Sequence, residues 1–155
     1  VVHESQKKGC PLLGLTVRNW DFSLFTLEQL ASVHISFQPT LANKKMLFSN
    51  DILFRDGILF TTGFHKGKAL LSFLQEISFI PKRIVMIDDS MKHLQNVEEV
   101  LQEKHIPFLG LHYRFPEGKV KRFSPAIADM EWKYMRKILS DDQAKAYLEK
   151  DLQSK

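Results

Sequence analysis

The chain has 155 residues, of which 44% are hydrophobic and 26% charged, and its formal net charge is +4. This length and composition are typical of one globular domain that can bury a core. No apolar run approaches the roughly 20 residues that cross a bilayer, so we expect a soluble chain without a membrane span. The polar and basic residues 1–8 do not resemble a signal peptide, and no compartment can be assigned. The single cysteine, Cys10, excludes an internal disulfide, and we expect a buried structural thiol there.

A strand, a helix and a hairpin are expected along the first half of the chain. The apolar run 11–16 predicts a strand, and the spacing of apolar residues over 21–31 predicts a helix. Two apolar triplets, 52–54 and 58–60, then flank a turn that contains Asp56-Gly57. Because Asp-Gly suits a tight turn with positive φ, this stretch predicts a β-hairpin.

Helices and strands alternate through the second half of the chain. Helical spacing places apolar side chains on one face of a helix, and short apolar runs mark strands. The expected elements are helix 67–77, strand 83–87, helix 92–104, strand 107–111, and helices 127–139 and 143–152. Strands that alternate with helices predict βαβ units, and therefore an α/β fold with a parallel sheet flanked by helices.

The strand over 83–87 ends abruptly in two carboxylates, Asp88 and Asp89, followed by Ser90. Its unbroken apolar run predicts a strand buried on both faces, as in a parallel sheet. Ligands bind at the carboxyl ends of such strands, and paired carboxylates supply the oxygen ligands that Mg²⁺ prefers. The alternative is that one aspartate merely caps the next helix, since Asp is a favoured N-cap residue.

Two further polar residues lie where a predicted strand ends or a predicted helix begins. Thr16 ends the first strand, and Lys66 begins the helix that precedes the acidic pair. A hydroxyl, an ammonium and a carboxylate pair at one sheet edge are the groups that phosphoryl transfer needs. The competing interpretations are that Thr16 caps a turn and that Lys66 is a solvated charge, with Lys68 as its rival. However, a lysine at a helix N-terminus opposes the macrodipole and so needs another reason to be there.

These motifs together resemble the haloacid dehalogenase (HAD) superfamily of Mg²⁺-dependent phosphohydrolases. The chain is more closely similar to an uncharacterised bacterial HAD-like family with the same LGLT-R, HKG and IDDS signatures. The resemblance covers about 11–113 and implies a Rossmann-like (HAD-type) parallel sheet flanked by helices, with a β-hairpin insertion. Residues 1–155 would then form a partial HAD-like α/β domain, with its core at 11–113 and a helical segment at 126–152.

The resemblance also implies roles for individual residues. It implies Mg²⁺ as the cofactor and a phosphorylated small molecule or phosphoprotein as the substrate. Arg18 and Asn19 follow Thr16 and are candidate substrate contacts, although a surface salt bridge suits Arg18 equally well. The implied set is catalytic and substrate-binding Thr16 and Lys66, substrate-binding Arg18 and Asn19, and metal-binding Asp88 and Asp89.

The chain departs from the family pattern in its first motif. The family's DxD motif carries the nucleophilic aspartate on the central strand, and this chain contains no DxD. The chain therefore resembles the C-terminal portion of a longer protein, without the central strand of its sheet. We expect it to be inactive alone. Because unpaired strands expose backbone groups, we also expect it either to be unstable alone or to be completed by another polypeptide, with the missing N-terminal segment of the same protein as the expected partner.

Other functions stay open at this point. A non-catalytic HAD-fold binding or effector protein would keep the fold without the nucleophile. A receiver-like phosphoacceptor domain is disfavoured, because receivers carry their acidic pair before the Thr and Lys. Basic residues gather at Arg114, Lys119, Lys121 and Arg122, but no nucleic-acid motif accompanies them. A solvated loop or a basic rim around an anionic ligand explains them better, so we expect no nucleic-acid partner.

Overall fold

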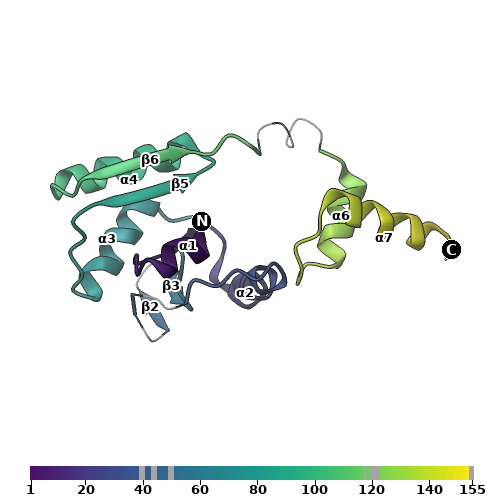
Figure 1. The fold of residues 1–155 in the computed structure, drawn as a ribbon, viewed down its shortest axis with the longest axis horizontal. Helices are drawn as coiled ribbons and strands as arrows, with labels where there is room; N and C mark the ends of the chain where they lie inside the picture. Colours follow the sequence, from purple (N-terminus) through teal and green to yellow (C-terminus); the bar gives the residue numbers. More distant parts are fainter. Residues whose placement is uncertain (39–40, 43–44, 49–50, 117, 119–122, 154–155) are drawn as a thin grey trace. The chain divides into compact units, whose positions relative to one another are not determined.

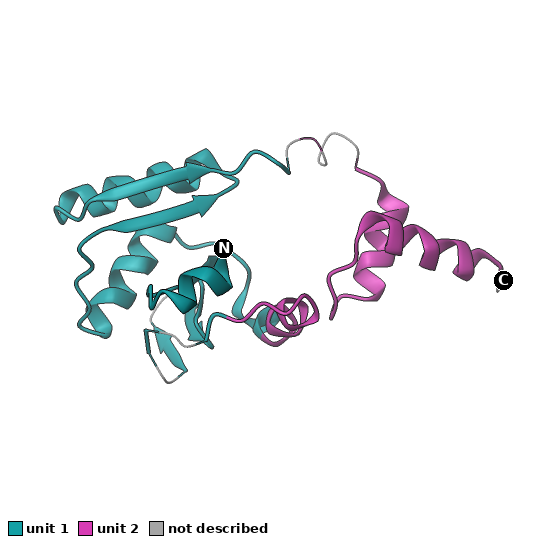
Figure 2. Cartoon of the chain, viewed as in Figure 1, with its two compact units in different colours: residues 1–23, 37–116 teal, residues 24–36, 117–155 magenta. Residues whose placement is uncertain are grey.

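The computed structural model describes residues 1–38, 41–42, 45–48, 51–116, 118 and 123–153. They form two compact units, residues 1–23 with 37–116 and residues 24–36 with 117–155 (Figures 1 and 2). The elements are α1 (Val2–Lys7), β1 (Gly14–Thr16), the 3₁₀ helix η1 (Trp20–Phe22), α2 (Ser23–Ser32), β2 (Met46–Phe48), β3 (Ile52–Arg55), β4 (Ile58–Phe60), α3 (Lys66–Glu76), β5 (Ile84–Asp88), α4 (Met91–Glu103), β6 (Phe108–His112), α6 (Pro125–Lys133) and α7 (Asp141–Gln153).

The first unit contains a four-stranded sheet with the order β1-β4-β3-β2. The strands β1 and β4 are parallel, whereas β4, β3 and β2 are antiparallel. The predicted hairpin is confirmed as β3 and β4, joined by Asp56 and Gly57 with φ of 48° and 82°. Positive φ at both central residues is the geometry that a two-residue hairpin turn requires. The hairpin therefore supplies two of the four strands of this sheet and is not an insertion beside a parallel sheet.

A second sheet in the same unit pairs β5 with β6 in parallel, and α4 connects the two strands. The helix α4 packs on both strands and also against α3. This βαβ unit confirms an α/β chain with parallel pairing flanked by helices. The strands β2, β3 and β4 are antiparallel to one another, because their short connections allow only antiparallel neighbours.

The hydrophobic core of the first unit lies between the hairpin and the two helices α3 and α4. Phe54 of β3 stacks on Phe73 of α3 with ring centroids 4.6 Å apart. The apolar residues of α3 recur every three or four positions, so they form one buried stripe. The buried cluster consists of Ile52, Phe54, Leu59, Ala69, Leu70, Phe73, Leu74, Val97 and Leu101.

Two expectations about burial were wrong. The side chains of Val85 and Ile87 in β5 are each 55% exposed, so this strand is not buried on both faces. Successive side chains point to opposite faces of a sheet, and only the face with Ile84 and Met86 packs on the core. Cys10 is exposed because it follows the short helix α1, which contributes no buried residue.

The second unit consists of α2, α6 and α7. The Gln29 side-chain amide donates to the Met135 carbonyl at 2.6 Å, and the Arg136 guanidinium donates to Glu28 at 2.9 Å. The same guanidinium lies 5.1 Å from the centre of the Phe25 ring. The helix predicted at 21–31 thus groups with the C-terminal helices α6 and α7.

None of the helices in the described part of the chain is long and apolar enough to cross a membrane, in agreement with the sequence. In the predicted basic cluster, Arg114 is described and exposed. Lys119, Lys121 and Arg122 lie outside the described residues.

Candidate functional site

A buried ion pair between Lys66 and Asp88 forms the centre of the candidate site. Lys66 is the first residue of α3, and Asp88 is the last residue of β5. The Lys66 Nζ atom donates to Asp88 Oδ2 at 2.6 Å, and the two residues are only 6% and 9% exposed. Buried charges are tolerated when they are paired in this way. The pairing also explains why a lysine begins a helix, where its charge opposes the macrodipole.

The second oxygen of the Asp88 carboxylate is held by the start of α4. Asp88 Oδ1 accepts the backbone N–H of Ser90 at 2.8 Å and lies 3.2 Å from Nδ1 of His93. Ser90 is the N-cap residue of α4, so neither aspartate occupies the capping position. The arrangement fixes the carboxylate from both sides, between the N-termini of α3 and α4.

The hydrogen bonds around Asp88 decide its protonation state. Burial is the largest single influence. It raises the pKa of the Asp88 carboxyl, because burial disfavours the charged form. The hydrogen bond and charge of Lys66, the Ser90 N–H and His93 favour the carboxylate and together outweigh burial. The pKa of Asp88 therefore lies below its ordinary value, and Asp88 is a carboxylate at neutral pH.

Close packing of α3 on α4 brings Lys66 to this position. A Cβ atom added at Gly67 would lie 2.5 Å from the Asn96 carbonyl oxygen and 3.1 Å from the Cα atom of Val97. Cβ atoms essentially never lie within 3.0 Å of a heavy atom from a distant residue, so the contact with the Asn96 carbonyl oxygen would force the helices to shift. The Lys66-Gly67 sequence thus has a structural reason, because the glycine lets the helices approach and the lysine then reaches Asp88.

The structure places the residues around Thr16 in a separate hydrogen-bond network. Thr16 Oγ1 accepts the backbone N–H of Arg18 at 3.3 Å, and the Asn19 side chain accepts from Asp21 and caps η1. Both Arg18 and Asn19 are exposed. Within the described residues, Thr16 makes no hydrogen bond to Lys66 or Asp88. The loop at 16–18 is instead bonded through its backbone to residues 61–63, which lead into α3.

Asp89 lies beside the ion pair but does not take part in it. His112 at the end of β6 places Nε2 3.1 Å from the Asp89 backbone oxygen. No group of three or more His, Cys, Asp or Glu side chains suited to a metal ion occurs in the described part of the chain. Asp88 and Asp89 by themselves therefore do not complete a metal site.

Sequence reasoning missed two residues at this edge of the first unit. His93 stands three residues after the N-cap of α4, a position whose side chain commonly reaches back over the helix start. Thr61 follows β4, which is the parallel neighbour of β1. Thr61 therefore lies at the same edge of the sheet as Thr16. The Thr61 hydroxyl is buried and has no hydrogen-bond partner among the described residues. The strand register, had it been known, would have pointed to Thr61.

The chain is similar to proteins of Chlamydia and Rickettsia. A protein of Chlamydia trachomatis that is named "Putative outer membrane protein" is 34% identical over 119 residues, covering 77% of this chain and 45% of the relative. A protein of Chlamydia muridarum with the same name is 33% identical, covering 86% of this chain and 56% of the relative. An uncharacterised protein of Rickettsia prowazekii is 26% identical over 126 residues, covering 73% of this chain and 45% of the relative.

The chain thus spans about half the length of the curated relatives it matches. No solved structure matches it. The family described as "Protein of unknown function (DUF2608)" matches residues 1–145, nearly the whole chain. The chain therefore belongs to the DUF2608 family.

Proposed function

We propose that this chain is part of a Mg²⁺-dependent phosphoryl-transfer hydrolase of the HAD type, which acts on a phosphorylated small molecule or a phosphoprotein. The observation that carries the proposal is the buried Lys66–Asp88 pair, at 2.6 Å, at the carboxyl end of β5. Ligand sites in α/β folds lie at such strand ends. A fixed ammonium beside a carboxylate is the arrangement that phosphoryl transfer uses to bind phosphate and metal.

Each residue would have a distinct task in this reaction. The Lys66 ammonium would neutralise negative charge on the transferred phosphoryl group. The Thr16 hydroxyl would donate its proton to a phosphoryl oxygen while its oxygen continues to accept the Arg18 N–H. Arg18 and Asn19 are exposed and would contact the rest of the substrate.

The metal requires ligands beyond those described. Asp88 and Asp89 offer the oxygen atoms that Mg²⁺ binds, but Asp88 already accepts from Lys66, Ser90 and His93. The described residues therefore fit a metal site only in part. We propose that a further segment of the protein supplies the remaining carboxylates, including the nucleophile that the DxD motif provides in the HAD superfamily.

The same observation favours a second candidate, a HAD-fold binding or effector protein without catalysis. In the structure the charge of Asp88 is balanced by Lys66 and needs no metal. If the complete protein lacks an acidic pair that can face Asp88, this second function is the better one.

The test is hydrolysis of p-nitrophenyl phosphate by the 155-residue chain and by the protein extended with the sequence encoded upstream of Val1. We expect Mg²⁺-dependent, chelator-sensitive activity in the extended protein only. Lys66→Met is expected to abolish the activity, whereas Lys68→Met, at an exposed position two residues along the same helix, is the matched control. Activity that survives chelator or Lys66→Met would overturn the proposal. Inactivity of a well-folded extended protein would support the non-catalytic alternative.

A further inference from the structure

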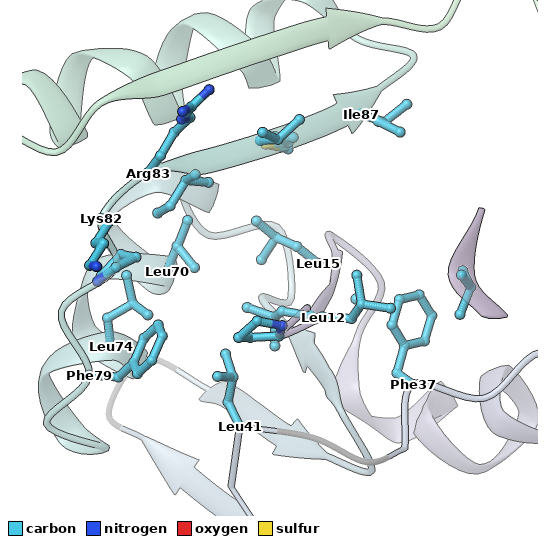
Figure 3. Close-up of a pocket in the computed structure, with 18 of the residues that line it drawn as sticks. Leu12, Leu15, Phe37, Leu41, Leu70, Leu74, Phe79, Lys82, Arg83 and Ile87 are labelled. Carbon is cyan, nitrogen blue, oxygen red and sulfur yellow. The ribbon is translucent and has the colours of Figure 1, made fainter. Parts of the chain in front are cut away.

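An apolar groove of about 710 Å³ runs through the first unit (Figure 3). Residues Leu12–Leu15 border it from the β1 side, and Ile84–Ile87 border it from β5. Leu70, Leu74 and Phe79 also line it, and all three belong to α3 or to the segment after it. The groove therefore separates the four-stranded sheet from the two-stranded sheet.

The lining shows that the groove faces strand edges. Side chains of consecutive strand residues point to opposite faces of a sheet. A cavity over one face would contact every second residue, but this one is bordered by four consecutive residues of β5. The same holds for Gly14 and Leu15 of β1. The groove thus lies along the edges of both strands.

Backbone hydrogen bonds identify the groups on those edges. On β1, Gly14 donates to Gly57 and Thr16 accepts from Thr61, so these residues face β4. In a parallel pair, alternate residues bond to the same neighbour, which leaves the N–H and C=O of Leu15 directed away from β4.

The strand β5 has the same pattern on its own side. Ile84 donates to Pro107 and Asp88 accepts from Tyr113, so the even-numbered residues face β6. The backbone groups of Val85 and Ile87 are therefore directed away from β6. Among the described strands, β1 pairs only with β4 and β5 only with β6. Unpaired edges of this kind are templates for another strand.

We propose that the groove binds one extended, apolar β-strand, which hydrogen-bonds to Leu15 on one side and to Val85 and Ile87 on the other. Such a strand would join the two sheets into one. The apolar walls require an apolar strand, because a polar one would lose its hydration without new partners.

The occupant we infer is a segment of the same polypeptide outside the matched region. About half of each curated relative lies outside the match, so these proteins contain the chain to supply it. A second observation indicates that a helix accompanies the strand. Val85, Ile87, Leu109 and Leu111 share one face of the β5–β6 pair and are 44–55% exposed. Parallel sheets are normally covered on both faces.

This inference is independent of the catalytic proposal, because it concerns only the sheet. Its test uses the 155-residue chain and 15-residue peptides that tile the unmatched part of the Chlamydia muridarum relative. We expect one apolar peptide to slow amide hydrogen exchange at Leu15, Val85 and Ile87 by tenfold or more, as strand addition does through main-chain hydrogen bonds. No phosphatase assay is involved, so peptide binding tests the inserted strand separately from the proposed function, which only the activity of the extended protein tests.

Variants make the test specific. Ile87→Lys places a charge in the groove at a half-exposed position and should weaken peptide binding tenfold or more. Leu47→Lys on β2, 67% exposed and outside the groove, is the matched control and should leave binding unchanged. The inference is overturned if no peptide protects these three amides, or if Leu47→Lys weakens binding as much as Ile87→Lys. It is also overturned if protection appears without peptide and rises with protein concentration, which would identify a second copy as the occupant.

Discussion

The hairpin β3–β4 and the parallel pair β5–β6 are both short apolar strand pairs, yet their burial differs. Every residue of β3 and β4 except Arg55 is buried. In β5 half-buried and exposed residues alternate up to the buried Asp88, and the three central residues of β6 are exposed. Residues on both faces of the hairpin are therefore buried, whereas described elements cover only one face of the parallel pair. Apolar sequence therefore specifies burial only when the covering elements are present.

The two regions also carry different residues of the candidate site. Thr16 ends a strand of the enclosed sheet, and Asp88 ends a strand of the open pair. The groove between β1 and β5 separates them. If one inserted strand closes that groove and runs parallel to β1 and β5, its carboxyl end would lie at the edge that carries Thr16, Lys66 and Asp88. The segment that pairs with β1 and β5 would then be the one that we propose to supply the further metal ligands.

The largest expected effect concerns the hairpin. Phe54→Ala removes a fully buried ring that stacks on Phe73 at 4.6 Å. We expect the free energy of unfolding to fall by about 3–5 kcal/mol, as in other buried Phe-to-Ala substitutions. Urea unfolding followed by circular dichroism measures it, with Leu47→Ala at an exposed position as the control. A loss below about 1 kcal/mol would mean that the hairpin core is loosely packed. The contrast between a well-packed hairpin and an open β5–β6 pair would then be wrong.

The next effect concerns the ion pair at the end of β5. Asp88→Asn leaves the buried Lys66 charge opposite a neutral amide and should cost about 3 kcal/mol. The double variant with Lys66→Met removes both charges and should recover most of the loss. If the double variant is less stable than Asp88→Asn, the unpaired Lys66 charge is not the cause of the stability lost in Asp88→Asn.

The ion pair also predicts a dependence on pH. Asp88 has a lowered pKa in the folded state, so its contribution is complete above the ordinary aspartate pKa of about 4 and is lost as the pH falls through the folded value. Below pH 4, the stability of the wild type should therefore converge on that of Asp88→Asn. Unfolding curves between pH 2 and 7 measure this, and a constant difference over that range would contradict it.

A smaller effect is expected where α3 meets α4. Gly67→Ala forces a methyl group against the Asn96 carbonyl and should cost about 1–3 kcal/mol. Because the helices must separate, Lys66 should also lose its contact with Asp88, which a crystal structure of the variant would show. Ser72→Ala, at an exposed position of α3, is the control and should change stability by less than about 0.5 kcal/mol.

The smallest effect is expected on the open face of β5. Val85→Thr keeps a β-branched shape at a half-exposed position and should change the unfolding free energy by less than about 0.5 kcal/mol. In the protein extended by its upstream sequence, the same substitution should cost more, since the new segment would cover this face. Equal effects in the two proteins would contradict the inferred strand and helix.

Local patterns predicted most elements correctly. The hairpin follows from Asp56-Gly57 between two apolar triplets, and the helices α3 and α4 follow from their apolar spacing. The strand β2 and the helix α1 were not predicted, because both are short and carry weak patterns. Apart from the hairpin, such patterns could not give the order and register of the strands, since these depend on contacts between distant residues.

The sequence by itself determined where chemistry could occur, since strand ends and helix starts are local features that positioned Thr16, Lys66 and the Asp88-Asp89 pair. Only the tertiary structure decided which of these residues meet. It joined Lys66 to Asp88 because Gly67 allows α3 to pack on α4, and it added His93 to the pair. It left Thr16 in another network and left β5 half uncovered. The physical reason is that burial and ion pairing depend on which elements surround a residue, and these elements come from distant parts of the chain.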